Sequence, residues 1–236
     1  SKIFNLGDAE DALFFIDTSI GIAGERSSSA KIQYSEFIRY FNLITELFKN
    51  KMYNESIQES DYLMNFSLFG DGRIKLLFIK AASALELDNI AQARASLTMI
   101  ETADNKKQFG AERIYYIAKS YEKENNPDAA IAEYLKIYKL FPQNNYADNA
   151  LFYASKLFAQ KKEDYSAAEK YLNLVINDYS QSDYADNALF LKAQLFDNIP
   201  KIKNYSIAEQ LYRQLYKNYP KSKFAEESQL RFFGKF

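Results

Sequence analysis

Carboxylates, lysines and tyrosines are the side chains with which this chain could do acid–base chemistry. The sequence contains no cysteine, no histidine and no tryptophan. Without cysteine there is no disulfide, thiolate nucleophile or thiolate metal ligand, and without histidine the commonest general base and zinc ligand is missing. Ser-His-Asp chemistry is therefore excluded. Catalysis would have to rest on carboxylates, lysine, tyrosine or a metal site built from oxygen ligands.

Pairs of neighbouring carboxylates are candidates for a catalytic acid and base. Asp8 lies close to Asp11 in the sequence, and Glu226 directly precedes Glu227. Neither pair has convergent partners in the sequence, so both are poor candidates for glycoside hydrolysis. The glycines of "GDGR" at 70–73 predict a connection between helices and not a phosphate loop. The sequence predicts a protein that is not an enzyme and needs no cofactor.

The charge and hydropathy of the chain argue against a nucleic-acid-binding protein and against a membrane-spanning segment. Thirty basic and 31 acidic residues give a formal net charge of −1, so there is no basic footprint for nucleic acid. No apolar run approaches the roughly 18 residues of a membrane span. The 47% of hydrophobic residues suffices for a buried core. Because the sequence opens at Ser1 without a leader, we expect that a signal peptide or a lipid anchor originally preceded it.

The strongest pattern is a repeated helix start, which would position any functional side chain. "YADNALF" occurs at 146–152 and again at 184–190, a spacing of 38 residues. Related segments begin at Phe109, 37 residues before the first copy, and at Phe224, 40 residues after the start of the second. A fixed period of this size predicts a repeat architecture.

The segments between these helix starts also match one another. Each carries an alanine, a large residue four positions later and an apolar residue seven positions later, which is one stripe of a helix. These stripes are Ala130, Tyr134 and Ile137; Ala168, Leu172 and Val175; and Ala208, Tyr212 and Leu215. Pro142 and Pro220 end two of these helices. Weaker copies lie upstream, with Ala93 and then Ser56 at the alanine position.

The chain therefore reads as units of helix, turn and helix. The first helix of each unit carries a small residue, at Ala81, Ala118, Ser155 or Ala193. Small side chains at facing positions let two antiparallel helices cross closely. The count is about five helix pairs over 33–220, followed by a single helix near 222–233.

This pattern resembles the tetratricopeptide repeat, in which a small residue, an aromatic residue, an alanine, a large apolar residue and a proline recur over about 34 residues. The resemblance implies an all-α, right-handed α-solenoid with capping helices at both ends. We expect residues 1–32, with an apolar stretch from Ala12 to Ile22, to form an N-terminal cap or extension. Residues 33–236 would form the solenoid and its C-terminal capping helix. The units are longer than the family consensus, and the consensus tryptophan is absent.

Within "YADNALF" most letters have a structural explanation. Asn145 and Asp183 precede the two copies and are expected to cap the helices, and Asp148 and Asp186 favour the helix N-terminus. Alanine and leucine face the partner helix. Only the asparagine and the phenylalanine remain for function.

The resemblance implies that first helices line a groove that binds other proteins. The predicted partner-binding residues recur along the first helices, next to the buried position or at helical spacing from it. They are Phe78, Tyr115, Lys119, Asn149, Phe152, Lys156, Asn187 and Phe190. The alternative is that these rings only pack between neighbouring units.

The predicted function is a non-enzymatic scaffold that binds a peptide segment or a helix of another protein. Junctions such as "NYPKSKFAEES" resemble those of bacterial envelope proteins, including outer-membrane assembly lipoproteins and the periplasmic coordinators of the Tol–Pal system. The resemblance implies a periplasmic location with an envelope or outer-membrane partner. The alternatives are a carboxylate-dependent enzyme acting on an envelope glycan and a cytoplasmic chaperone adaptor.

Overall fold

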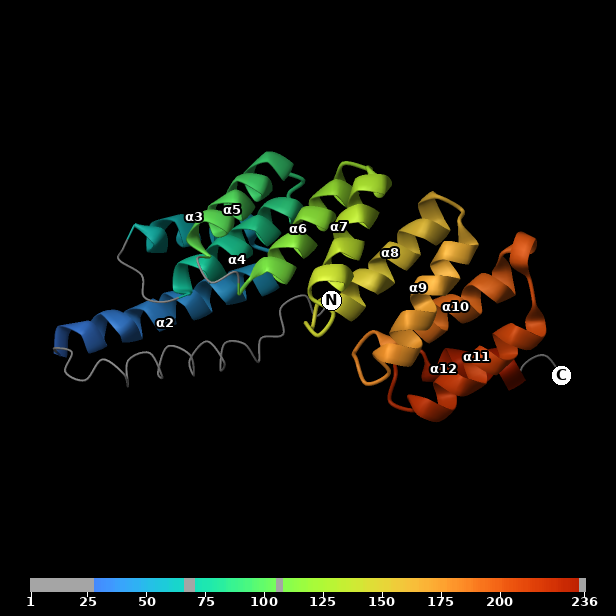
Figure 1. Ribbon diagram of the computed structural model, residues 1–236. Helices are drawn as coiled ribbons and strands as arrows, with labels where there is room; N and C mark the ends of the chain where they lie inside the picture. The colour runs from blue at the N-terminus through green and yellow to red at the C-terminus, as the bar shows by residue number, and fades with distance from the viewer. Residues whose placement is uncertain (1–27, 66–70, 105–107, 234–236) are drawn as a thin grey trace. The chain divides into compact units, whose positions relative to one another are not determined.

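The computed structural model describes residues 28–65, 71–104 and 108–233 (Figure 1). Within these stretches the chain forms eleven α-helices and one short 3-10 helix and no strand, which confirms the predicted all-α class. Most of the predicted N-terminal extension, including the stretch Ala12 to Ile22, lies outside the described residues. No described helix is both long and apolar enough to cross a membrane.

The chain divides into two compact units, Ser1–Gln108 and Phe109–Phe236. The first contains α2 (Ser28–Lys49), α3 (Tyr53–Met64), α4 (Gly72–Glu86) and α5 (Ile90–Ala103). The second contains α6 (Gly110–Lys123), α7 (Pro127–Leu140), α8 (Ala147–Lys161), α9 (Tyr165–Asp178), α10 (Ala185–Asn198), η1 (Pro200–Ile202), α11 (Tyr205–Asn218) and α12 (Ala225–Phe233). Consecutive helices pack in pairs, as in a tetratricopeptide solenoid, and α12 follows the last pair as the expected closing helix.

The helix crossings occur at the predicted small residues. Ala130, Ala168 and Ala208 of the second helices are fully buried, and so are Ala118, Ser155 and Ala193 of the first helices. The large residues four positions after the alanines are buried with them. The predicted stripe is therefore the contact between the two helices of each pair.

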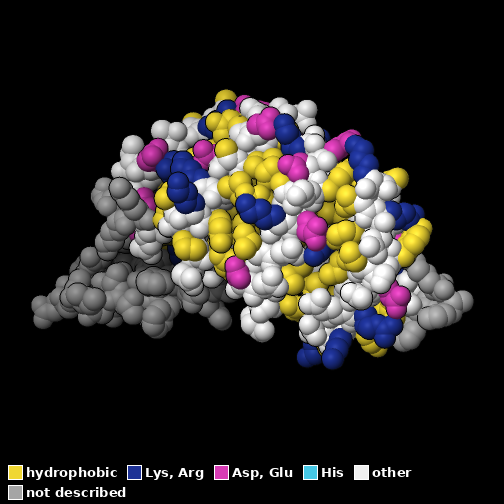
Figure 2. Space-filling view, turned by 45° about the vertical axis from the view of Figure 1, so that its right-hand side comes forward, with side chains coloured by type: hydrophobic (Ala, Val, Ile, Leu, Met, Phe, Trp, Pro, Cys, Tyr) yellow, Lys and Arg dark blue, Asp and Glu magenta, His cyan; other side chains and the backbone are white. Residues whose placement is uncertain are grey.

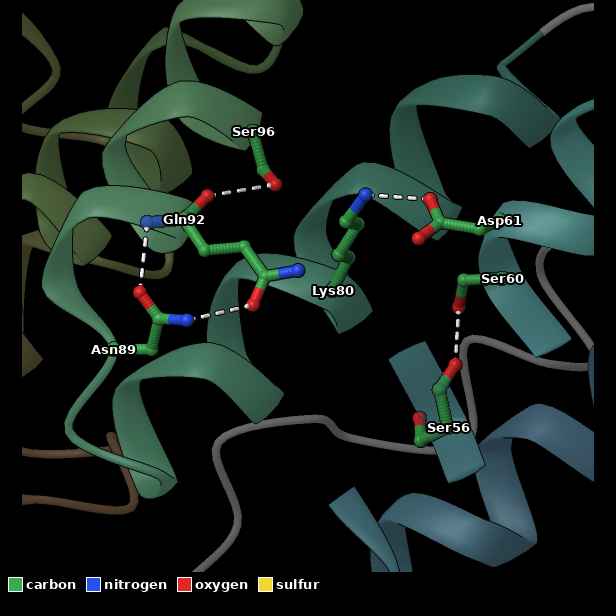
Figure 3. A network of polar contacts seen from close by, with 7 residues as sticks. All are labelled: Ser56, Ser60, Asp61, Lys80, Asn89, Gln92 and Ser96. Atoms are coloured by element: carbon green, nitrogen blue, oxygen red, sulfur yellow. Dashed lines mark hydrogen bonds and ion pairs between the residues drawn. The ribbon is translucent and has the colours of Figure 1, made fainter. Parts of the chain in front are cut away.

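In the first unit, Ser56 replaces the alanine of one crossing, and further serines are buried beside it (Figure 3). Ser56, Ser60 and Ser83 are fully buried. Ser60 Oγ donates to the carbonyl of Ser56 at 2.7 Å, and Ser83 Oγ lies 3.4 Å from Ser56 Oγ. These hydroxyls find partners inside the crossing, so their burial leaves no hydrogen bond unmade.

The turns inside the pairs follow one design that the sequence reasoning did not predict. Asn89, Asn126, Asp164 and Asn204 each cap a second helix by accepting a hydrogen bond from the backbone N–H three residues later. The preceding residue, at Asp88, Asn125 and Glu163, has a left-handed backbone with φ of 56°, 54° and 50°.

The starts of the first helices correct one prediction. Asn145 and Asp183 do not cap α8 and α10. The side chains of Asn144 and Ser182 accept the backbone N–H of Tyr146 and Tyr184 instead, at 3.0 and 3.2 Å. The N-cap lies one residue later than predicted, because the aromatic residue, not the residue before it, occupies the cap position of the helix.

Hydrogen bonds with the period of the repeat join successive pairs in the second unit. Tyr179 Oη donates to the carbonyl of Pro142, and Tyr219 Oη to that of Ser180, both at 2.7 Å. Ser222 Oγ donates to Asp186 at 2.6 Å. Ser182 donates in the same way to Asp148. The aspartate of "YADNALF" thus binds the serine of the next junction.

A polar pair, with its tyrosine buried, alternates with an apolar pair along the second unit. Tyr134 Oη donates to Glu122, and Tyr212 Oη lies 3.5 Å from Asp197, which also pairs with Arg231 at 3.2 Å. In the middle pair of helices the equivalent positions hold Leu172 and Ala159, both buried. The same location is therefore filled either by tyrosine with an acid or by leucine with alanine.

Replacing both members of the polar pair is expected to cost less stability than the two single replacements added together. Asp197→Ala leaves the Tyr212 hydroxyl unpaired and should lower the free energy of unfolding by about 1–3 kcal/mol. The double variant Asp197→Ala/Tyr212→Leu copies the middle pair and should be less destabilised than the sum of the single variants by at least about 0.5 kcal/mol. Urea denaturation of all four proteins measures this coupling. Strict additivity would contradict the pairing.

Candidate functional site

The candidate site lies on the first helices of the second unit. Helices α8 and α10 contact each other, and ring contacts join α6 to α8. The predicted partner-binding residues of this unit all lie on these three helices. Phe78 lies on α4 of the first unit.

Three of the four predicted aromatic anchors are inside the protein. Phe78, Tyr115 and Phe190 are only 1%, 0% and 7% exposed. Such rings offer almost no surface to a partner. In the structure they serve the core, as the alternative interpretation of the repeated rings describes.

The rings of the second unit are buried by the start of the next first helix. Tyr115 packs on Tyr146, with ring centroids 5.2 Å apart, and Phe152 packs on Tyr184 at the same distance. The third pair, Phe190 and Phe224, is stacked with centroids 4.2 Å apart and an interplanar angle of 12°. The tyrosine or phenylalanine that opens each repeat thus covers the aromatic ring of the preceding repeat.

Tyr153 is the centre of the aromatic cluster, and the sequence reasoning missed it. Its ring lies 6.0 Å or less from the rings of four neighbours on three elements and the next junction: Tyr115, Tyr134, Phe152 and Tyr184. It is only half-buried. Its position could have been predicted from the sequence, because it lies four residues after Asn149 and three before Lys156 and therefore on the same helix face.

Lys119 is engaged within the chain. Its Nζ lies 3.1 Å from Glu122 Oε1 and 4.5 Å from the centre of the Tyr153 ring. Glu122 also accepts the hydroxyl of Tyr134. The lysine therefore covers Tyr153 with a partly neutralised charge, in a cation–π geometry.

Asn187 is also engaged locally. Its Nδ2 donates to the carbonyl of Asp183 at 3.0 Å and to Asp186 Oδ1 at 2.9 Å. This amide stabilises the start of α10. Its N–H groups are used within the chain and are not available to a partner's backbone. The asparagine of "YADNALF" thus has a structural task in the second copy.

Three predicted residues remain together on α8. Asn149 and Phe152 are half-buried, and Lys156 is exposed. With Tyr153 they occupy successive turns of one helix face, at spacings of three, four and seven residues. We call Asn149, Phe152, Tyr153 and Lys156 the α8 patch.

The wider surface mixes apolar groups with single charges. Figure 2 shows hydrophobic side chains that reach the surface in groups, with individual Lys, Arg, Asp and Glu side chains between them. This is a surface suited to another protein more than to a highly charged polymer.

The buried tyrosines stay protonated at neutral pH. Burial raises the pKa of Tyr115, Tyr134, Tyr146 and Tyr184 above the ordinary value, and neighbouring phenols and carboxylates raise it further. Their hydroxyls therefore stay neutral and do not act as bases. Burial also raises the pKa of Asp148, and the hydrogen bond from Ser182 opposes this shift.

The carboxylate pairs considered for catalysis do not form a shared site in the described part of the chain. Glu226 and Glu227 are both exposed on α12, and Glu227 pairs with Arg231 at 3.4 Å. Asp8 and Asp11 lie outside the described residues. No cluster of three or more acidic side chains that could hold a metal ion occurs among residues 28–65, 71–104 and 108–233.

Comparison with known families finds two matches to the tetratricopeptide repeat, at residues 114–144 and 187–222. The first covers most of α6 and all of α7, and the second covers most of α10 and all of α11, so each match is one helix pair. Together with the consecutive packing of helix pairs, these matches support a tetratricopeptide-repeat protein. A comparison with curated proteins finds no match.

The raised pKa values predict a loss of stability in alkali. Above about pH 10 the unfolded chain releases phenolic protons that the native state retains, so the free energy of unfolding should fall as pH rises. Denaturation between pH 8 and 11 measures the slope. Tyr134→Phe should make it shallower. A slope that Tyr134→Phe leaves unchanged would contradict the assignment.

Proposed function

We propose that this tetratricopeptide-repeat chain is a scaffold that binds another protein through the α8 patch. Repeats of this family suggest protein–protein interaction. The proposal contains no catalytic step. It assigns to Asn149, Phe152, Tyr153 and Lys156 the contact with a segment of the partner.

One observation carries this proposal: two half-buried rings lie beside an exposed lysine on one helix face. Phe152 and Tyr153 are fixed by rings below them, with centroids 5.2 Å from Tyr184 and 5.9 Å from Tyr134. Rigid aromatic groups give contact area at a low cost in side-chain entropy, and they are enriched at the centres of protein interfaces.

The size of the α8 patch suits one short segment. Seven residues of helix separate Asn149 from Lys156, which is about 10 Å. An extended peptide spans this length with about three residues, and a helix with about two turns. Affinity would come from the two rings, while Asn149 and Lys156 would select polar or acidic groups of the partner.

Exchange of the exposed lysine should weaken partner binding without unfolding the protein. Tagged wild-type and Lys156→Glu proteins are used for affinity capture from the native cell, followed by quantitative mass spectrometry. Proteins enriched by the wild type should fall about tenfold with the variant, and Phe152→Ala should deplete the same proteins. The matched control is Lys139→Glu, an exposed lysine on the second helix α7.

The control separates the α8 patch from general charge effects. Lys139→Glu should retain the captured proteins, and all variants should keep the helical circular-dichroism spectrum. If Lys156→Glu and Lys139→Glu capture the same proteins in the same amounts, the α8 patch is not the binding surface.

The location in the bacterial envelope stays a prediction, which rests on the style of the junctions between repeats. We propose a periplasmic scaffold that helps to assemble or stabilise an envelope protein. Fractionation of the native cells, with detection by an antibody, should find the protein in the periplasmic or outer-membrane fraction. Recovery in the cytoplasmic fraction alone would support the adaptor alternative instead.

A further inference from the structure

The last two junctions of the second unit, before α10 and before α12, are each made by the same three contacts. The first is the ring of a first helix under the ring that opens the next, as in Phe152 with Tyr184 and Phe190 with Phe224. The second is a serine hydroxyl on the aspartate of the first helix, as in Ser222 with Asp186 at 2.6 Å. The third is a tyrosine hydroxyl on a junction carbonyl, as in Tyr219 with Ser180.

Helix α12 and the junction before it have residues at the positions that bind the next repeat in the earlier copies, namely the apolar residue, the acidic residue and the junction carbonyl. Its opening residue Phe224 is 40 residues after Tyr184, so the same offset places Leu230 where the earlier helices have Phe190 and Phe152. Glu226 likewise replaces Asp186 as the acidic residue, and Pro220 replaces Ser180 as the junction carbonyl.

Among the residues that the structure describes, these positions on α12 and on the junction before it are exposed. Leu230 is 66% exposed, whereas Phe190, at the equivalent position, is 7% exposed. Glu226 and Pro220 are exposed as well. The surface continues an interface that the chain already uses twice, and its apolar centre lies open to solvent. We call Pro220, Glu226 and Leu230 the α12 edge.

We propose that the α12 edge binds a helix start of a partner protein, distinct from the segment held by the α8 patch. The internal copies define the chemistry of this occupant. It presents an aromatic residue at the N-cap of a helix. A hydroxyl side chain two residues earlier binds Glu226, and a tyrosine three residues before that binds the carbonyl of Pro220. The aromatic ring covers Leu230.

The occupant is a different protein and not a second copy of this chain. The junction rings of the second unit that could fill this role are already used, because Tyr146, Tyr184 and Phe224 pack on Tyr115, Phe152 and Phe190 of their own chain. Releasing one of them would open the interface between two helix pairs. A copy of this chain would therefore have to give up an equivalent contact to make the new one.

A peptide that copies the chain's own junction tests the α12 edge. The probe is a fluorescent, hydrocarbon-stapled peptide with the sequence of residues 178–198, which contains Tyr179, Ser182, Tyr184 and the α10 helix. Fluorescence anisotropy with the full chain should show saturable binding. Leu230→Glu should raise the dissociation constant at least about tenfold, because it places a charge under the incoming ring.

Matched controls identify the surface. Leu140→Glu changes a leucine on α7 that is 53% exposed and should leave peptide binding unchanged. Lys156→Glu in the α8 patch should leave it unchanged too, so failure here is separate from failure of the proposed function. Absence of saturable binding, or equal losses for Leu230→Glu and Leu140→Glu, would overturn the proposal. Dimers in sedimentation velocity that Leu230→Glu dissolves would assign the edge to a second copy and overturn the choice of occupant.

Discussion

The contact that organises the second unit is an aromatic ring placed under the ring that opens the next repeat. Alanine and serine at the helix crossings allow each pair of helices to approach closely, but they do not determine how one pair meets the next. The ring pairs Tyr115 with Tyr146, Phe152 with Tyr184 and Phe190 with Phe224 do this, at centroid distances of 4.2 to 5.2 Å. Hydrogen bonds from junction tyrosines and serines add direction to a contact that is mainly hydrophobic.

This use of the rings decides which residues are left for function. A ring that joins two helix pairs cannot also bind a partner unless part of it stays exposed. Tyr115 and Phe190 are buried, whereas Phe152 keeps part of its surface and has Tyr153 beside it. The proposed partner surface is therefore concentrated on α8, and the other first helices contribute mainly to the stability of the array.

The sequence alone predicted the elements that depend on local periodicity. The stripes that begin at Ala130, Ala168 and Ala208 identified the crossings, because residues four and seven positions apart lie on one face of a helix. The burial of Tyr115 was not predictable in this way, since it depends on Tyr134 and Tyr146 from other elements. The cap position of α8 was missed by one residue, because helix boundaries depend on the geometry of the turn and not on residue type alone.

The central claim is that α8 carries the partner-binding surface of a scaffold, and site-specific photocrosslinking in the native cell tests it most directly. A photoreactive benzoylphenylalanine replaces Lys156 on α8 or Lys139 on α7, and both positions are exposed. After irradiation, position 156 should give a discrete crosslinked product that contains a second protein, and position 139 should not. Crosslinks from position 139 with none from position 156 would contradict the account.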